Sequence, residues 1–524
     1  MRPSDPLTRR SFLNVAATGL ATLAAGAATI PDGPSPPVQT FDLEEATIAQ
    51  LQRGLRTGRY SGRGLIDAYL ARIEAIDRAG PTLRSVIETN REAPELGERL
   101  DVERLAGRMR GPLHGIPVLI KDNIATKDLM TTTAGSIALE GNRAPRDAVV
   151  AERLRAAGAV IIGKTNLSEW ANFRSTQSSS GWSGRGGQCR NPYVLDRNPC
   201  GSSSGTGAAI AANLAAVGVG TETDGSIVCP SGACSLVGIK PTLGLIGGAG
   251  IIPIAHSQDT AGPMARTVTD AAILLGVLAA KDYSASLDAN GLKGARIGVA
   301  RKKFFGYSPE ADALVEAAID VLRRQGAVIV DPADIPHAGE YDDTELTVLL
   351  YEFKAELNAY LTEWAPDVEP RTLKELIAFN DANRVRELPY FGQELFLQAQ
   401  EKGPLTDQAY RDALEKNGRL SRTEGLDVVF GQHTLDAIVA PTGSPAWPTD
   451  LVNGDHFLGA SSTPAAVAGY PSISVPVGYA FGLPVGMSLM GRPSSEGTLI
   501  KLAYAYEQAA KARKPPRFLA TAAL

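Results

Sequence analysis

The sequence is poor in the two residue types on which most metal and redox centres depend. Its 524 residues include only four cysteines and five histidines. No two cysteines have the C-x-x-C spacing, and the histidines are scattered along the chain. Structural and catalytic zinc sites need clustered Cys and His ligands, so this composition argues against a zinc protein.

An excess of basic residues and a long internal apolar run are also missing. Lys and Arg number 52 against 57 Asp and Glu, which gives a net charge of −5 and provides no electrostatic surface for nucleic acid. No internal window reaches the roughly 18 apolar residues that a membrane-spanning helix needs. With 44% hydrophobic and 21% charged residues, the composition is typical of a globular protein with no membrane span in its mature form.

The N-terminal segment differs from the remainder of the chain. Arg9 and Arg10 precede a mildly apolar run over residues 15–25, and Ala25-Gly26-Ala27 has the A-x-A form of a cleavage site. This order is typical of a twin-arginine export signal. We therefore predict a signal peptide at 1–27 and a mature domain at 28–524 that is periplasmic or secreted. An uncleaved anchor and a frayed N-terminus are the alternatives.

Helical and strand-like segments alternate along most of the mature chain. Apolar residues at helical spacing predict helices over 46–56 and 62–79, and short apolar runs such as Val118–Ile120 predict buried strands. Residues 340–430 are instead mostly helical. The pattern predicts an α/β fold, with a large single domain, a central mainly parallel or mixed sheet covered by helices, and a helical excursion at about 340–430.

The few cysteines fall in one stretch of the chain, between residues 189 and 234. An oxidising compartment permits disulfides, and four cysteines allow three pairings. One of them, Cys229, lies in a small-residue segment where packing is the simpler explanation. The sequence leaves the pairing open among Cys189, Cys200, Cys229 and Cys234.

Two loops rich in glycine and serine lie close together in the sequence. The first is Cys-Gly-Ser-Ser-Ser-Gly at 200–205, and the second is Gly-Thr-Glu-Thr-Asp-Gly-Ser at 220–226. Glycine permits tight turns and a close approach to a ligand, and consecutive backbone amides can stabilise developing negative charge. These features predict a serine hydrolase with Ser226 as its nucleophile.

Two other motifs in the chain favour different functions. Residues 158–165 match the Walker A phosphate loop, but the residues between its glycines are strand formers whose amides would bond within a sheet. Residues 201–205 match the nucleophile elbow of α/β hydrolases, which needs a preceding strand and a later histidine. A loop precedes this segment instead, and His256 is the one later histidine that merits consideration. Nucleotide binding and the elbow are therefore the weaker interpretations.

Lys121 follows a predicted buried strand and completes a candidate catalytic group with Ser202 and Ser226. A serine hydroxyl needs a base, and burial lowers the pKa of a lysine toward the neutral form that can be one. A second serine can pass the proton along, because a hydroxyl both donates and accepts. The alternatives are structural. Lys121 could form a surface ion pair with Asp122 or Asp128, and Ser202 could cap the following helix.

From about residue 41 to residue 506 the sequence closely resembles the amidase signature family. Within that family it looks most like the peptide amidases, which remove the C-terminal amide of peptides. Further stretches that support this likeness lie at 166–173, 180–188 and 349–354. The resemblance is carried by the segments Gly115–Asn123, Gly163–Trp170, Cys200–Gly205, Gly220–Ile227, Gly238–Thr242 and Gly469–Pro476.

The resemblance implies the amidase signature fold and a Ser–cis-Ser–Lys triad that cleaves a linear amide. The nucleophile would form an acyl-enzyme and ammonia would leave, without a metal or cofactor. Backbone amides would bind the oxyanion, one backbone carbonyl would orient the substrate amide, and a further serine would help to hold the lysine. The implied positions are the base Lys121, the bridging Ser202, the nucleophile Ser226, the oxyanion amides of Thr223, Asp224, Gly225 and Ser226, the carbonyl of Ala171, and the supporting Ser203.

One position departs from the commonest family pattern beside the expected oxyanion hole. Asp224 stands where glycine is frequent, and a carboxylate there would repel the developing negative charge. We expect its side chain to point away, so that only its amide has a role.

The predicted substrate is the C-terminal amide of a peptide, and the enzyme would act as a monomer or homodimer without nucleic acid. A broader hydrolase of aryl, fatty or amino-acid amides is one alternative. Another is the glutaminase-type subunit of an amidotransferase, which shares the triad. The predicted export signal argues against this second alternative, because the partners of such subunits are cytoplasmic.

Overall fold

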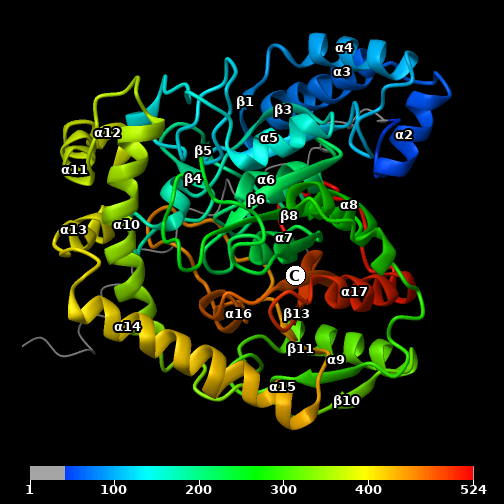
Figure 1. Ribbon diagram of the computed structural model, residues 1–524, viewed down its shortest axis with the longest axis vertical. Helices are drawn as coiled ribbons and strands as arrows, with labels where there is room; N and C mark the ends of the chain where they lie inside the picture. The colour runs from blue at the N-terminus through cyan, green and yellow to red at the C-terminus, as the bar shows by residue number, and fades with distance from the viewer. Residues whose placement is uncertain (1–41, 523–524) are drawn as a thin grey trace, which may run out of the picture. The chain divides into compact units, whose positions relative to one another are not determined.

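An eleven-stranded mixed sheet runs through the computed structural model, which describes residues 42–522 (Figure 1). The predicted fold class is therefore confirmed. In spatial order the strands are β1 (Val86–Thr89), β3 (Val160–Thr165), β2 (Pro117–Lys121), β6 (Val217–Glu222), β8 (Thr260–Ala265), β7 (Val237–Lys240), β12 (Ser472–Ala480), β13 (Leu483–Met490), β11 (Ala437–Pro441), β9 (Arg296–Val299) and β10 (Val328–Val330).

Parallel strands form two groups in this sheet, β3–β2–β6 and β11–β9–β10, and the strands between them are antiparallel. Every residue of β2 is buried, as expected for a parallel strand covered on both faces. In its register Ile120 is opposite Val219 of β6, and Lys121 is opposite Thr165 of β3. The carboxyl ends of β2 and β6 therefore lie together at one edge of the sheet.

Helices from both halves of the chain cover the sheet. A carboxy-terminal helix packs on β12, and a helix from the middle of the chain packs on β8 and β7. The helices outside the excursion are α2 (Ile48–Arg56), α3 (Gly62–Arg72), α4 (Ala93–Leu105), α5 (Val149–Ala156), α6 (Ser204–Ala211), α7 (Val228–Ala233), α8 (Val268–Ala279), α9 (Pro309–Arg324), α16 (Thr463–Ala468) and α17 (Glu496–Ala510).

The helical excursion predicted at about 340–430 is present as a run of helices along the left and lower edges of Figure 1. It begins with α10, whose buried face includes Phe353, Leu357 and Leu361. The run comprises α10 (Asp342–Trp364), α11 (Leu373–Ala382), α12 (Arg384–Glu387), α13 (Glu394–Gln400), α14 (Gln408–Gly418), the π-helical turn Arg419–Leu426 and α15 (Asp427–His433).

The structure differs from the sequence expectation mainly where a strand or helix is short. Strand β8 has the sequence Thr-Ala-Gly-Pro-Met-Ala. Glycine and proline are unfavourable in strand interiors, so strand propensity does not predict this segment. The small-residue segment after the first serine-rich loop is helical only as far as Ala211, and Asn213 adopts a left-handed conformation with φ of 62°. Asparagine tolerates that conformation better than most residues, which explains the early end of the helix.

The predicted signal peptide at 1–27 and the lead-in up to residue 41 lie outside the described residues, so the export signal stays a prediction. Within the part of the chain that the structure describes, no helix has both the length and the apolar character to cross a bilayer.

Gly205 lies where α6 passes closest to neighbouring backbone. A Cβ atom at this position would clash with the carbonyl oxygens of Ser85 and Asn166. The Gly205 amide also donates to the Asn166 carbonyl at 2.9 Å. The absence of a side chain therefore allows the first turn of α6 to pack directly on the backbone just before β1 and just after β3.

We predict that Gly205→Ala destabilises the protein by about 3 kcal/mol or more, because main-chain atoms cannot move aside as a flexible side chain would. The matched control is Gly418→Ala at the end of α14, where an added Cβ would meet nothing within 4 Å. That variant should be neutral or up to about 1 kcal/mol more stable. Denaturant unfolding measures both, and equal stability of the two variants would contradict the packing argument.

Candidate active site

Lys121 ends strand β2 and is fully buried. Its Nζ lies 2.7 Å from Ser202 Oγ, 2.9 Å from Thr221 Oγ1 and 3.2 Å from the Thr221 carbonyl oxygen. The alternative of a surface ion pair is wrong, since Asp122 accepts from Thr133 and Asp128 pairs with Arg155. The lysine is instead directed at the first serine-rich loop.

Burial lowers the pKa of Lys121 from its ordinary value near 10.5 to about 7, although the charges of Asp259 and Glu222 act in the opposite direction. A neutral amine has two N–H donors and one lone pair. The two oxygens of Thr221 can accept the two donors, which leaves the lone pair for the Ser202 hydroxyl. The hydrogen-bond partners of Lys121 therefore suit a neutral lysine.

Ser202 follows a cis peptide bond with Gly201 and is fully buried. It does not cap the following helix, because its Oγ contacts Lys121 and α6 begins two residues later. The amide of the next residue, Ser203, donates to the Ser226 carbonyl at 3.1 Å. This bond places the backbone of Ser226 directly against the loop that carries Ser202.

Ser226 lies at the wall of a cavity of about 680 Å³. The residue is 8% exposed, whereas Lys121 and Ser202 are shielded completely. Within residues 42–522 its Oγ has no hydrogen-bond partner. The carboxylate of Glu222 accepts the amides of Ile227 and Val228, at 2.7 and 3.0 Å, and so fixes the start of α7 just beyond the serine. Ser226 is thus the member of the group that a substrate can reach.

The residues before Ser226 line the same cavity and are held by side chains from distant segments. Thr223 Oγ1 donates to Asp259 at 2.6 Å, and burial raises the pKa of Asp259 to about 7. Asp224 Oδ2 accepts from Thr463 Oγ1 at 2.6 Å, so its carboxyl group is directed at α16. Burial also raises the pKa of Asp224.

Ser203, expected to help hold the lysine, bonds Thr221 rather than Lys121. Its Oγ donates to the Thr221 carbonyl at 3.0 Å and accepts from the Thr221 amide at 3.2 Å. Asn123 donates to Thr221 Oγ1 at 2.9 Å. Thr221 is therefore the central partner that sequence reasoning missed. The available signal was the position of Thr221 in its strand. Thr221 lies two residues beyond Val219, and Val219 is opposite Ile120, the residue before Lys121.

Ala171 lines the cavity from the side of the short 3-10 turn Glu169–Asn172. Trp170 and Ala171 both have left-handed backbone conformations, with φ of 50° and 55°. A fully buried ion pair between Glu169 and Arg174, at 2.8 Å, lies in this segment. Ala171 is thus brought to the same cavity as Ser226, as the resemblance implies.

The packing explanation that the sequence favoured for Cys229 is wrong. Cys200 and Cys229 form a disulfide, so simple packing does not explain Cys229. Cys189 and Cys234 are free and buried. The pairing could not be chosen from sequence because the two bonded residues are brought together by the two serine loops, whose relative positions only the fold defines.

The competing motifs have structural roles in the described chain. The Walker-like segment enters β3, and Lys164 Nζ donates to the Ile124 carbonyl and Thr132 Oγ1, at 2.6 and 2.8 Å. A lysine held in this way cannot reach a phosphate. His256 has no bond to the serines and belongs to a different cluster.

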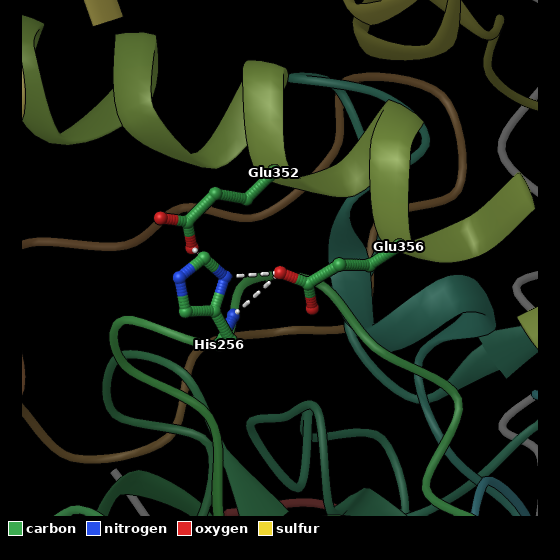
Figure 2. A group of neighbouring side chains, drawn as sticks. All are labelled: His256, Glu352 and Glu356. Atoms are coloured by element: carbon green, nitrogen blue, oxygen red, sulfur yellow. Dashed lines mark hydrogen bonds and ion pairs between the residues drawn. The ribbon is translucent and has the colours of Figure 1, made fainter. Parts of the chain in front are cut away.

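His256 lies between two glutamates of α10, Glu352 and Glu356 (Figure 2). Its hydrogen bond to Glu356 raises the pKa of the imidazole. In the part of the chain that the structure describes, this is the one group with ligand atoms close enough for a metal ion. However, the main-chain amides of His256 and Ser257 already donate to these carboxylates, at 3.2 and 3.0 Å. We therefore assign the cluster a structural role, in which it joins the 253–259 loop to α10.

The chain is similar to known proteins over most of its length. The family model described as Amidase matches residues 64–500. A probable amidase of Arabidopsis thaliana is 42% identical over 506 residues, covering 92% of this chain and 93% of that protein. The structure of native peptide amidase from Stenotrophomonas maltophilia is 50% identical with a TM-score of 0.87, covering 91% and 100% of the two chains. One of the glutamyl-tRNA(Gln) amidotransferase subunits of a Roseiflexus species is 35% identical, covering 89% of this chain and 96% of that protein.

The buried amine of Lys121 predicts a specific dependence of stability on pH. Between pH 7 and 10.5 the unfolded chain binds one more proton at this lysine than the folded chain does. The lysine therefore makes the free energy of unfolding rise with pH in that range, by about 1.4 kcal/mol per unit. In Lys121→Met this contribution is absent, so the stability difference between wild type and variant should grow in favour of the wild type from pH 7.5 to 9.5.

Denaturant unfolding at several pH values measures this difference. The control is Lys374→Met, which removes an exposed lysine of α11 and should give a difference that is constant with pH. A constant difference for Lys121→Met as well would mean that the lysine is charged in the folded protein.

Proposed function

This chain belongs to the amidase signature family, and we propose that it is a peptide amidase that hydrolyses the C-terminal amide of peptides. The observation that carries the proposal is the contact between the buried amine of Lys121 and Ser202, 2.7 Å apart beside a cavity lined by Ser226. This arrangement supports Lys121 as the base, Ser202 as the proton relay and Ser226 as the accessible nucleophile.

In the proposed mechanism Lys121 is neutral when the substrate binds. It takes a proton from Ser202, which takes one from Ser226 as that oxygen attacks the amide carbonyl carbon. The backbone amides of residues 223–226 stabilise the oxyanion, and loss of one good donor in such a site costs about 2.7–4 kcal/mol. The carbonyl of Ala171 accepts from the substrate amide and orients it.

The tetrahedral intermediate then collapses and the C–N bond breaks. The proton held by Lys121 returns through Ser202 to the leaving nitrogen, so ammonia departs as a neutral molecule. Water attacks the acyl-enzyme by the same proton route and releases the peptide carboxylate. Ser203 and Thr221 act indirectly, by fixing the oxygen atoms that bond the lysine.

The lining of the cavity supports a neutral peptide amide over free glutamine. Apolar side chains form part of the wall, and the carboxyl groups of Asp224 and Asp455 also border it. Among its described lining residues there is no Lys, Arg or His. A substrate with a free carboxylate would therefore be buried without a cationic partner, which is unfavourable by several kcal/mol. The apolar lining residues are Phe173, Ile254, Leu349, Trp447 and Phe457.

Ser226→Ala should lower kcat for ammonia release by at least about 10⁴-fold, because the acyl-enzyme cannot form. Its circular dichroism and Tm should stay close to those of the wild type. Ser202→Ala should lower kcat for ammonia release by about 10²–10⁴-fold, because the proton relay is interrupted while the nucleophile remains. The control is Ser178→Ala, which removes another cavity serine and should retain most of the activity. Substantial turnover by folded Ser226→Ala would refute the assigned nucleophile.

Ammonia release over a substrate panel tests the substrate class. Peptide amides with an apolar C-terminal residue should exceed glutamine in kcat/KM by at least about 100-fold, given the cost of burying an unpaired carboxylate. Fatty amides and anilides complete the panel. Preference for glutamine would favour the amidotransferase-type alternative, and preference for fatty amides or anilides would favour the broader hydrolase.

A further inference from the structure

The disulfide Cys200–Cys229 connects the two loops that carry the catalytic serines. Cys200 lies two residues before Ser202, and Cys229 lies three residues after Ser226. Their Cα atoms are 6.0 Å apart, and both residues border the cavity onto which Ser226 opens. The bond therefore forms part of the wall of the active site itself.

Each of these loops has a glycine next to its serine. Gly201 precedes Ser202 through the cis peptide bond, and Gly225 precedes Ser226 with a left-handed φ of 75°. Glycine restricts the backbone less than any other residue. At these two glycines no side chain restrains the backbone, so links between the loops contribute to the distance between the two serine oxygens.

Hydrogen bonds also join the two loops. Ser203 Oγ donates to the Thr221 carbonyl and accepts from the Thr221 amide, at 3.0 and 3.2 Å. One backbone hydrogen bond runs from the Ser203 amide to the Ser226 carbonyl at 3.1 Å. Behind it, α6 and α7 pack closely where Gly207 faces the backbone of Pro230. On the cavity side, Trp447 and Ala233 pack around Cys200 and Cys229. The disulfide is the covalent link on the side of the loops that faces the substrate.

We propose that Cys200 and Cys229 are positioning residues that hold Ser226 within proton-transfer reach of Ser202. The inference rests on the proposed roles of these two serines. Misplacement of a reacting group by about 1 Å can reduce a rate about 10²-fold, so a link that restrains two glycine-bearing loops acts on kcat. Thiols that reduce this bond would slow the chemical step and leave substrate binding largely intact.

The test compares Cys200→Ser/Cys229→Ser with the control Cys189→Ala/Cys234→Ala, which removes the two free buried thiols. Assays run well below the unfolding midpoint of each variant. In the first variant kcat should fall at least about tenfold while KM changes by less than about threefold. The reaction of Ser226 with a small sulfonyl fluoride should slow in parallel, because it needs the same proton relay. The control should keep both rates.

Wild-type protein reduced with dithiothreitol should lose activity to the same extent and recover it after reoxidation. A lower Tm with unchanged kcat and unchanged sulfonyl fluoride reactivity would overturn the proposal, because the bond would then only stabilise the fold. Titration of four thiols in the unreduced, denatured wild type would also overturn it. Failure of the proposed function is distinguishable, because it would appear as activity in Ser226→Ala whatever the state of the disulfide.

Discussion

The active site depends on keeping one amine out of water. Lys121 is placed at the end of a strand buried on both faces, and no ion pair within the described chain compensates its charge there. Burial disfavours the charged form, and the opposing effects of Asp259 and Glu222 are too small to restore the ordinary pKa. The surrounding hydrogen-bonding groups are one carbonyl and two hydroxyls, which suit an amine with a free lone pair. Any change that admits water to this strand end would charge the lysine and remove the proposed base.

The helical excursion supports the proposed oxyanion loop from a distance. Thr223 is held by Asp259, and the neighbouring Gln258 donates to Glu345 of α10 at 2.8 Å. The same 253–259 loop is joined to α10 a second time through the His256 cluster (Figure 2). Glutamates of one long helix therefore hold the loop whose Asp259 bonds Thr223. This explains why a segment outside the sheet can matter to the chemistry.

Local sequence patterns predicted the parts of the site that local structure builds. The apolar run before Lys121 identified a buried strand, and the glycine–serine segments identified two tight loops. The fold class and the helical excursion followed from periodicity in the same way. Thr221 and the Cys200–Cys229 bond could not be found so, because each depends on which segments become neighbours in space. Strand β8 was missed because the pairing of its neighbours, and not its own composition, makes it a strand.

The charges of the cavity bear on the direction of the proposed reaction. A neutral amide enters a space bordered by Asp224 and Asp455 and by no cationic side chain of the described chain. Hydrolysis converts that amide into a carboxylate at the same position. With no cation to hold it, the product is bound less favourably than the substrate by the same electrostatics that admit the substrate. In the proposed reaction, amide recognition and product release thus follow from a single property of the cavity.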